Sequence, residues 1–124
     1  MINELCLSLI ILNNIKMFDF FKTKKQYQDL AGQAFKQMLT DNKDCVLLDV
    51  RTAGEYRQGA IKGAINLDIM GADFHAKIAK LDPHKTYLIY CRSGNRSAQA
   101  CKYMTSLGFK DVYNLSGGIG SFPL

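Results

Sequence analysis

The segment CRSGNRS, residues 91–97, gathers groups that could carry out nucleophilic chemistry. It begins with a cysteine, Cys91, and places two arginines, Arg92 and Arg96, in the next five positions. Gly94 lets the backbone turn tightly and approach a ligand closely. The remaining members are small and leave their backbone N–H groups available to point inward and bind an anion. These small residues are Ser93, Asn95 and Ser97.

Such surroundings should lower the pKa of the Cys91 thiol. Backbone N–H groups, a helix N-terminus and the guanidinium groups of Arg92 and Arg96 all stabilise a thiolate relative to a thiol. A thiolate beside an anion-binding loop suits a nucleophile that attacks a negatively charged substrate. The simpler alternative is a buried, inert cysteine, which is how we interpret Cys45 and Cys101. The two arginines and the glycine directly after Cys91 favour the reactive interpretation.

The chain around this segment alternates short apolar runs with helical periodicity. The apolar runs predict strands, and they occupy residues 45–50, 63–67, 86–90 and 111–115. Apolar residues at helical spacing predict helices, in residues 32–42, in residues 72–81 and from near Ser97 to residue 107. A short helix is expected in residues 52–59, where Thr52 and Glu55 have the spacing of a capping box. This alternation predicts a single α/β domain with a central, mostly parallel sheet and helices on both faces.

The position of Cys91 within this pattern also favours chemistry. The cysteine follows the strand at residues 86–90 directly, and the next helix begins a few residues later. In open parallel sheets, ligands bind beyond the carboxyl ends of the strands, where each strand leads into a helix. The expected topology therefore places the thiol at the edge of the sheet where such folds bind their ligands.

Three segments resemble the motifs of the rhodanese family. CRSGNRS (91–97) is similar to the active-site loop of these sulfurtransferases, and LLDVRTAGEYRQGAIKGAINL (47–67) resembles a second hallmark segment. NLSGGIGSF (114–122) is similar to the closing motif of the family. The resemblance extends over nearly all of residues 26–124 and implies a single rhodanese-like domain there, preceded by an N-terminal extension in residues 1–25.

The resemblance implies a persulfide relay in which Cys91 is the catalytic nucleophile. The Cys91 thiolate would take a sulfane sulfur from thiosulfate or a persulfide donor and pass it to a thiol or to cyanide. Arg92 and Arg96 would bind the small anionic donor, while the loop N–H groups would hold the persulfide. The loop residues assigned to this cradle are Ser93, Gly94, Asn95 and Ser97. The relay needs no metal and no organic cofactor, and its second partner is a thiol acceptor or a sulfur-accepting protein.

The segment DVR, followed by Glu55, is interpreted as structural support near the site. Arg51 could pair with Asp49 or with Glu55, because paired charges at strand ends are commonly scaffolding. The two histidines, His75 and His84, show no ligand spacing to a cysteine, so no metal site is predicted.

Two alternative functions stay open. Rhodanese-like domains also serve as non-catalytic binding modules or as sulfur carriers for a partner protein. The related Cys-dependent phosphatases and arsenate reductases are the second alternative, but their loops are one residue longer. Four residues separate Cys91 from Arg96 here. The shorter loop makes a tighter cradle, which favours a sulfur atom over a tetrahedral phosphate.

The composition is that of an ordinary single globular domain. The chain has 124 residues, 48% of them hydrophobic, and a formal net charge of +5. Its lysines are scattered, and no basic stripe interleaved with aromatic residues indicates a nucleic-acid partner. The four cysteines belong to a chain long enough to fold without disulfides. They therefore favour reduced thiols and a reducing compartment, and with no convincing targeting signal in the sequence the expected location is the cytoplasm.

The first residues require a separate interpretation. The apolar run from Leu5 to Leu12 is too short to span a bilayer, so no integral membrane span is predicted. Glu4 stands where a signal peptide would carry basic residues, and no small-residue cleavage site follows. We expect residues 1–25 to be poorly ordered or peripheral to the domain.

Overall fold

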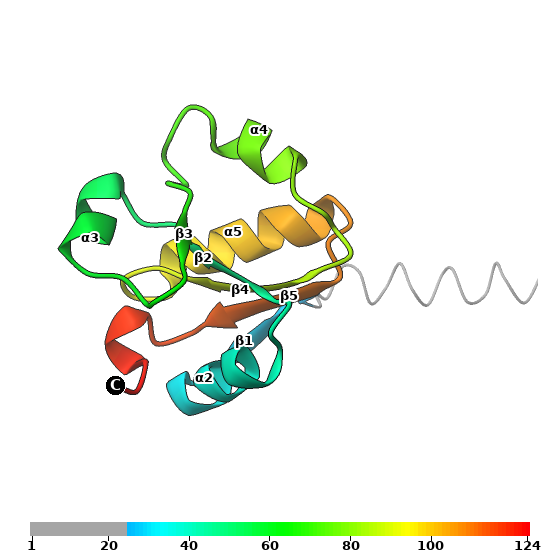
Figure 1. Ribbon diagram of the computed structural model, residues 1–124. Coiled ribbons are helices and arrows are strands. Elements are labelled where there is room, and N and C mark those ends of the chain that lie inside the picture. The colour runs from blue at the N-terminus through cyan, green and yellow to red at the C-terminus, as the bar shows by residue number, and fades with distance from the viewer. Residues whose placement is uncertain (1–24) are drawn as a thin grey trace, which may run out of the picture.

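The apolar runs of the sequence form a five-stranded parallel sheet in the computed structural model, which describes residues 25–124 (Figure 1). The order of the strands across the sheet is β1-β5-β4-β2-β3, and every neighbouring pair is parallel. The predicted α/β fold with a mostly parallel sheet is therefore confirmed. The strands are β1 (Gln28–Leu30), β2 (Val46–Asp49), β3 (Ile65–Asn66), β4 (Thr86–Tyr90) and β5 (Asp111–Leu115).

Helices cover both faces of the sheet, as the alternating pattern predicts. In Figure 1, α2 lies on one face, while α4 and α5 lie on the other. The short helix α3 follows β2 and stands at the end of the sheet where β2 and β4 terminate. The helices are α2 (Gly32–Asp41), α3 (Ala53–Gln58), α4 (Phe74–Ala79) and α5 (Asn95–Ser106), followed by the 3₁₀ turn η1 (Ile119–Ser121).

Four elements differ from the sequence prediction, among them α4, which is shorter than the helix expected at 72–81. The edge strand β1 was not predicted, because its residues are mostly polar and exposed and it forms only by pairing with β5. The strand expected at 63–67 shrinks to β3, which has two residues. Helix α5 begins at Asn95, earlier than the expected start near Ser97.

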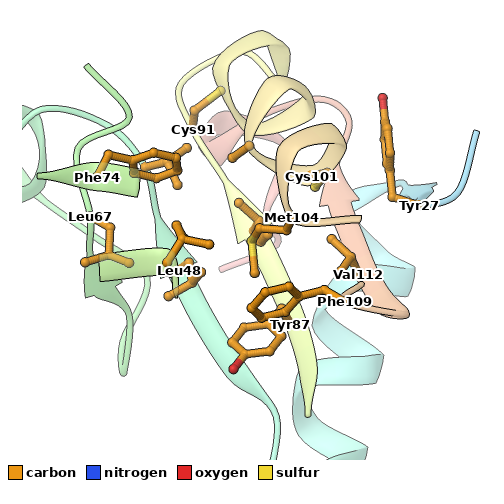
Figure 2. Close-up of a cluster of buried hydrophobic side chains, with 14 residues drawn as sticks. Tyr27, Leu48, Leu67, Phe74, Tyr87, Cys91, Cys101, Met104, Phe109 and Val112 are labelled. Carbon is orange, nitrogen blue, oxygen red and sulfur yellow. The ribbon is translucent and has the colours of Figure 1, made fainter. Parts of the chain in front are cut away.

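Successive residues of the central strands supply two separate apolar cores, because side chains alternate between the faces of a sheet. Leu88 packs with Phe35 of α2 on one face. Leu48 packs with Met104 of α5 on the other (Figure 2). Burial on both faces explains why these strands are continuous apolar runs in the sequence. Figure 2 shows that the second core ends at Cys91, beside the start of α5.

The predicted N-terminal extension, residues 1–25, lies outside the described residues except for Lys25. The short apolar run and Cys6 fall in the same undescribed part. Within residues 25–124, no helix is both long enough and apolar enough to cross a membrane.

Candidate active site

The loop between β4 and α5 surrounds the side chain of Cys91. Its sulfur, Sγ, accepts hydrogen bonds from the backbone N–H of Gly94 at 3.1 Å and of Ser97 at 3.3 Å. The Ser97 hydroxyl donates a third hydrogen bond to Sγ at 3.2 Å. Both Cys91 and Ser97 are fully buried, with 0% of their surface exposed. The donors at the N-terminus of α5 thus converge on a single sulfur atom, in the manner of helix N-termini that bind anions.

These hydrogen bonds decide the ionisation of the thiol. Burial by itself raises the pKa of Cys91, because it disfavours the charged form. The hydroxyl and the N–H of Ser97, together with the backbone N–H groups of Gly94 and Ser93, outweigh burial and hold the pKa below its ordinary value. The loop therefore stabilises a thiolate mainly through backbone groups and one hydroxyl.

The other described cysteines lie in surroundings that raise the pKa of the thiol. Cys101, on α5, is fully buried as predicted, and burial raises its pKa. Cys45, which was expected to be buried, is only partly buried, and its pKa is also raised by burial. All three cysteines described by the structure are free thiols. Among residues 25–124, Cys91 is the cysteine whose surroundings favour the thiolate.

The closing segment, residues 114–122, packs directly against the loop. Gly94 has a φ of +102°, and a Cβ at this position would lie 2.2 Å from a carbonyl oxygen of the closing segment. A Cβ at Gly118 would lie 1.9 Å from the carbonyl oxygen of Arg92. The N–H of Ile119 donates to the carbonyl of Cys91 at 2.9 Å. Two positions without side chains thus allow the loop and the closing segment to pack backbone against backbone.

Asn114, on β5, is a residue of the site to which the sequence analysis assigned no role. Its amide nitrogen donates to the carbonyl of Gly94 at 3.3 Å and to a carboxylate oxygen of Asp29 at 2.9 Å. The side chain is almost completely buried. The signal in the sequence was its place as the first residue of the closing motif NLSGGIGSF. Asn114 connects β1 to the turn at which α5 begins.

The two loop arginines lie in different environments. Arg96 donates from both terminal nitrogens to the carboxylate of Glu55, at 2.8 and 3.0 Å. The Arg96 hydrogen bond, followed by the N–H of Thr52, lowers the pKa of Glu55 to about 2. Arg92 is exposed, and its guanidinium makes no hydrogen bond or ion pair with any residue of the described range 25–124. The structure therefore brings Arg92 to the rim of the loop and joins Arg96 to α3.

The remaining cradle residues, Ser93 and Asn95, are exposed. The backbone N–H of Ser93 is among the groups that lower the pKa of Cys91. Asn95 is the first residue of α5, and its side chain faces solvent. Both residues contribute to the cradle through the course of the backbone more than through their side chains.

Asp49 and Arg51 form a buried ion pair at the carboxyl end of β2. Two side-chain nitrogens of Arg51 donate to Asp49, the shortest contact being 2.6 Å. The Tyr90 hydroxyl donates to the same carboxylate at 2.7 Å, and Arg51 also donates to the carbonyl of Gly59 at 2.7 Å. Of the two partners considered for Arg51, the structure shows Asp49 and not Glu55. This network joins β2, β4 and the C-terminal end of α3.

Comparisons with known proteins assign the chain to a family. A sequence model of the rhodanese-like domain matches residues 32–122. The chain belongs to the rhodanese-like domain family. A sulfurtransferase from Allochromatium vinosum is 36% identical over 91 residues, which are 73% of this chain and 83% of that protein. The resemblance seen in the sequence motifs is thereby confirmed.

Two further similarities extend this assignment of the rhodanese-like domain. A tRNA uridine(34) hydroxylase from Cytophaga hutchinsonii is 37% identical over 113 residues, which are 89% of this chain but only 35% of that longer protein. The crystal structure of a rhodanese-related protein from Thermoplasma volcanium superposes with a TM-score of 0.63 at 31% identity. That match covers 78% of this chain and 96% of the other.

The three motifs of this rhodanese-like domain meet at one end of the sheet. The loop 91–97 encloses the sulfur, the segment 47–67 supplies α3 with Glu55, and the closing segment packs behind the loop. Chemically, the arrangement provides a stabilised thiolate, one exposed guanidinium and one guanidinium held in an ion pair. It is suited to nucleophilic attack on a small donor atom that fits within the loop.

Proposed function

We propose that this rhodanese-like domain is a sulfurtransferase that moves sulfane sulfur through a persulfide on Cys91. The observation that carries the proposal is the set of three hydrogen bonds that Sγ accepts from Gly94 and Ser97. These donors favour the nucleophilic thiolate before loading. The same donors are available to an anionic persulfide after loading, so one cradle serves both states.

In the loading step, the Cys91 thiolate attacks the sulfane sulfur of thiosulfate or of a persulfide. A bond forms between Sγ and that sulfur, and the sulfur–sulfur bond of the donor breaks. Sulfite leaves from thiosulfate with the bonding electron pair, whereas a thiolate leaves from a persulfide. The exposed guanidinium of Arg92 attracts an anionic donor to the loop. Arg96 is less exposed than Arg92 and donates hydrogen bonds to Glu55.

In the release step, a thiol or cyanide attacks the outer sulfur of the persulfide. The sulfur–sulfur bond breaks, Cys91 leaves as a thiolate, and the acceptor keeps the transferred sulfur. With cyanide as acceptor the product is thiocyanate. The hydrogen bonds from Gly94 and Ser97 stabilise the departing thiolate. Sulfur is transferred without any external oxidant or reductant.

The similarity to the Allochromatium vinosum sulfurtransferase supports this function, because the matched region spans most of both chains. The spacing of four residues between Cys91 and Arg96 favours sulfur transfer over phosphatase chemistry. The tRNA uridine(34) hydroxylase is matched over about a third of its length, so its full activity is not transferred to this chain. Because the relay requires a free Cys91 thiol, we place it in a reducing compartment such as the cytoplasm.

The proposal is tested by measuring the intact mass of the reduced protein before and after thiosulfate or cysteine persulfide, with cyanide added last. We expect the mass of one added sulfur atom, its removal by cyanide, and no gain in Cys91→Ala. Cys101→Ala is the matched control, since it removes a second buried thiol but should load normally. A folded wild-type protein that gains no sulfur from either donor would support a binding module instead. An equal loss of sulfur loading in Cys91→Ala and Cys101→Ala would indicate a two-cysteine mechanism.

A further inference from the structure

The positive charge of Arg96 is neutralised by the carboxylate of Glu55. Both terminal nitrogens of Arg96 meet both oxygens of the Glu55 carboxylate, at 2.8 and 3.0 Å. This two-bond geometry is the strongest form of an ion pair between arginine and a carboxylate. The two side chains are only 26% and 23% exposed, so water screens their attraction incompletely. A donor that enters the loop therefore meets a neutral pair in place of a free cation.

Glu55 is fixed in this position independently of Arg96. It is the third residue of α3, and its carboxylate accepts hydrogen bonds from the Thr52 N–H at 3.0 Å and the Thr52 hydroxyl at 3.1 Å. The N–H of Glu55 donates back to the Thr52 hydroxyl, which completes a capping box. At the other end of α3, Arg51 donates to the carbonyl of Gly59 at 2.7 Å. The carboxylate is thus held by the fold beside the active-site loop.

The charges around Cys91 disfavour a donor with two negative charges. The pKa of Arg96 is raised first by Glu55, and also by the negative charges of Cys91 and Asp68, which lie near it. With the thiolate formed, Cys91, Glu55 and Asp68 are anionic, whereas Arg92 and Arg96 are cationic. Coulomb energies scale with charge, so a dianion is repelled about twice as strongly as a monoanion.

We propose that Glu55 is a specificity-determining residue for sulfur donors. By cancelling the charge of Arg96, it disfavours loading from dianions such as thiosulfate relative to donors with one negative charge or none, such as small persulfides. This inference rests on the proposed function, because it presupposes that Cys91 accepts sulfur. It differs from the sequence expectation, in which Arg92 and Arg96 both bind the anionic donor.

Two nearly isosteric donors provide the test. Thiosulfate is a dianion, whereas methanethiosulfonate carries a methyl group in place of one oxygen and is a monoanion. In each case Sγ bonds to the sulfane sulfur, the sulfur–sulfur bond of the donor breaks, and sulfite or methanesulfinate leaves with the electron pair. The two donors differ in intrinsic reactivity, but this difference is the same for every variant. A change between variants in the ratio of the second-order loading rates therefore reports the effect of one charge.

Glu55→Gln should raise the ratio of thiosulfate to methanethiosulfonate loading by about three- to tenfold, the effect of one charge several ångströms away in partly screened surroundings. Glutamine keeps the capping box, because its amide oxygen also accepts from Thr52. Asp41→Asn is the matched control: it removes one negative charge at the C-terminal end of α2, which leads to the opposite end of the sheet. This control should leave the ratio unchanged.

A second variant tests whether a change in the ratio comes from the charge of Arg96 or from movement of the side chains. Arg96→Gln in the Glu55→Gln background restores a neutral pair, so it should return the ratio to the wild-type value. An unchanged ratio in Glu55→Gln, while both donors load, would overturn the inference, as would a ratio that stays raised in the double variant. Failure of wild-type Cys91 to load from these two donors and from cysteine persulfide would instead refute the proposed function.

Discussion

Replacing Ser97 with alanine tests whether hydrogen bonding in the loop makes Cys91 a nucleophile. The Ser97 hydroxyl donates to Sγ at 3.2 Å, and its loss leaves the backbone N–H donors of Ser97 and Gly94 in place. Ser97 lies in the first turn of α5, where alanine is a good helix former. The residue is fully buried, so water cannot easily replace the lost donor. The substitution therefore removes one hydrogen bond from the thiolate and little else.

A hydrogen bond to a charged group contributes about 1.5–3 kcal/mol, and sulfur acceptors fall at the weak end of this range. Since about 1.4 kcal/mol corresponds to tenfold, we expect the thiolate population to fall about tenfold at pH values below the pKa of the wild type. The sign follows from the structure: the hydroxyl lowers the pKa of Cys91, so its removal raises that pKa. At a pH above both pKa values the two proteins should react at the same rate.

The assay is the rate of alkylation of Cys91 by iodoacetamide across neutral and alkaline pH. Trypsin cleavage after Lys85 and Arg92 yields the peptide 86–92, in which Cys91 is the sole cysteine, so mass spectrometry isolates its reaction. Ser93→Ala is the matched control, because Ser93 is exposed and contributes through its backbone N–H. Identical pH profiles for Ser97→Ala and wild type would refute the reasoning. An equal shift in Ser93→Ala would also refute it.

Two further substitutions test how the loop is positioned. Gly94→Ala places a Cβ 2.2 Å from the carbonyl oxygen of Ser116 at a φ of +102°, so we expect destabilisation of more than about 1 kcal/mol by urea unfolding and a large loss of sulfur loading. Asp49→Asn leaves Arg51 buried without its counter-charge, so we expect the free energy of unfolding to fall by about 3–5 kcal/mol. The folded fraction of Asp49→Asn should still load, because Asp49 acts through the scaffold; loss of loading without loss of stability would contradict this.

The sequence was informative wherever local rules act. The strand at 86–90 is buried on both faces, so its apolar run could be recognised directly, and Cys91 follows it without interruption. The capping box of α3 depends on two residues three positions apart, which is also a local signal. The course of the loop follows from Gly94, whose positive φ suits a residue without a side chain. These features depend on neighbouring residues and required no knowledge of tertiary contacts.

The missed features depend on contacts between distant segments. Strand β1 is mostly exposed and polar, and it forms because β5 offers a free edge. Asn114 meets Asp29 across 85 positions of the chain, so no local pattern could reveal their hydrogen bond. The pairing of Arg96 with Glu55 spans 41 positions. Composition and spacing indicate that such charges are present, but only the folded arrangement decides which of them neutralise each other.

Backbone groups and side chains contribute differently to the reactivity of Cys91 and to its selectivity among sulfur donors. The donors that lower the pKa of Cys91 are backbone N–H groups and one buried hydroxyl, all fixed by the start of α5. The charges that a donor meets come from side chains on different elements, with Arg92 and Arg96 on the loop and Glu55 on α3. A substitution at Glu55 should therefore change which donor loads Cys91, and because it frees the charge of Arg96 it should also lower the pKa of Cys91. Ser97→Ala should instead raise that pKa and leave the ratio of thiosulfate to methanethiosulfonate loading unchanged. The donor ratio and the pH profile of alkylation together distinguish the charge of Arg96 from the hydrogen bonds of the loop.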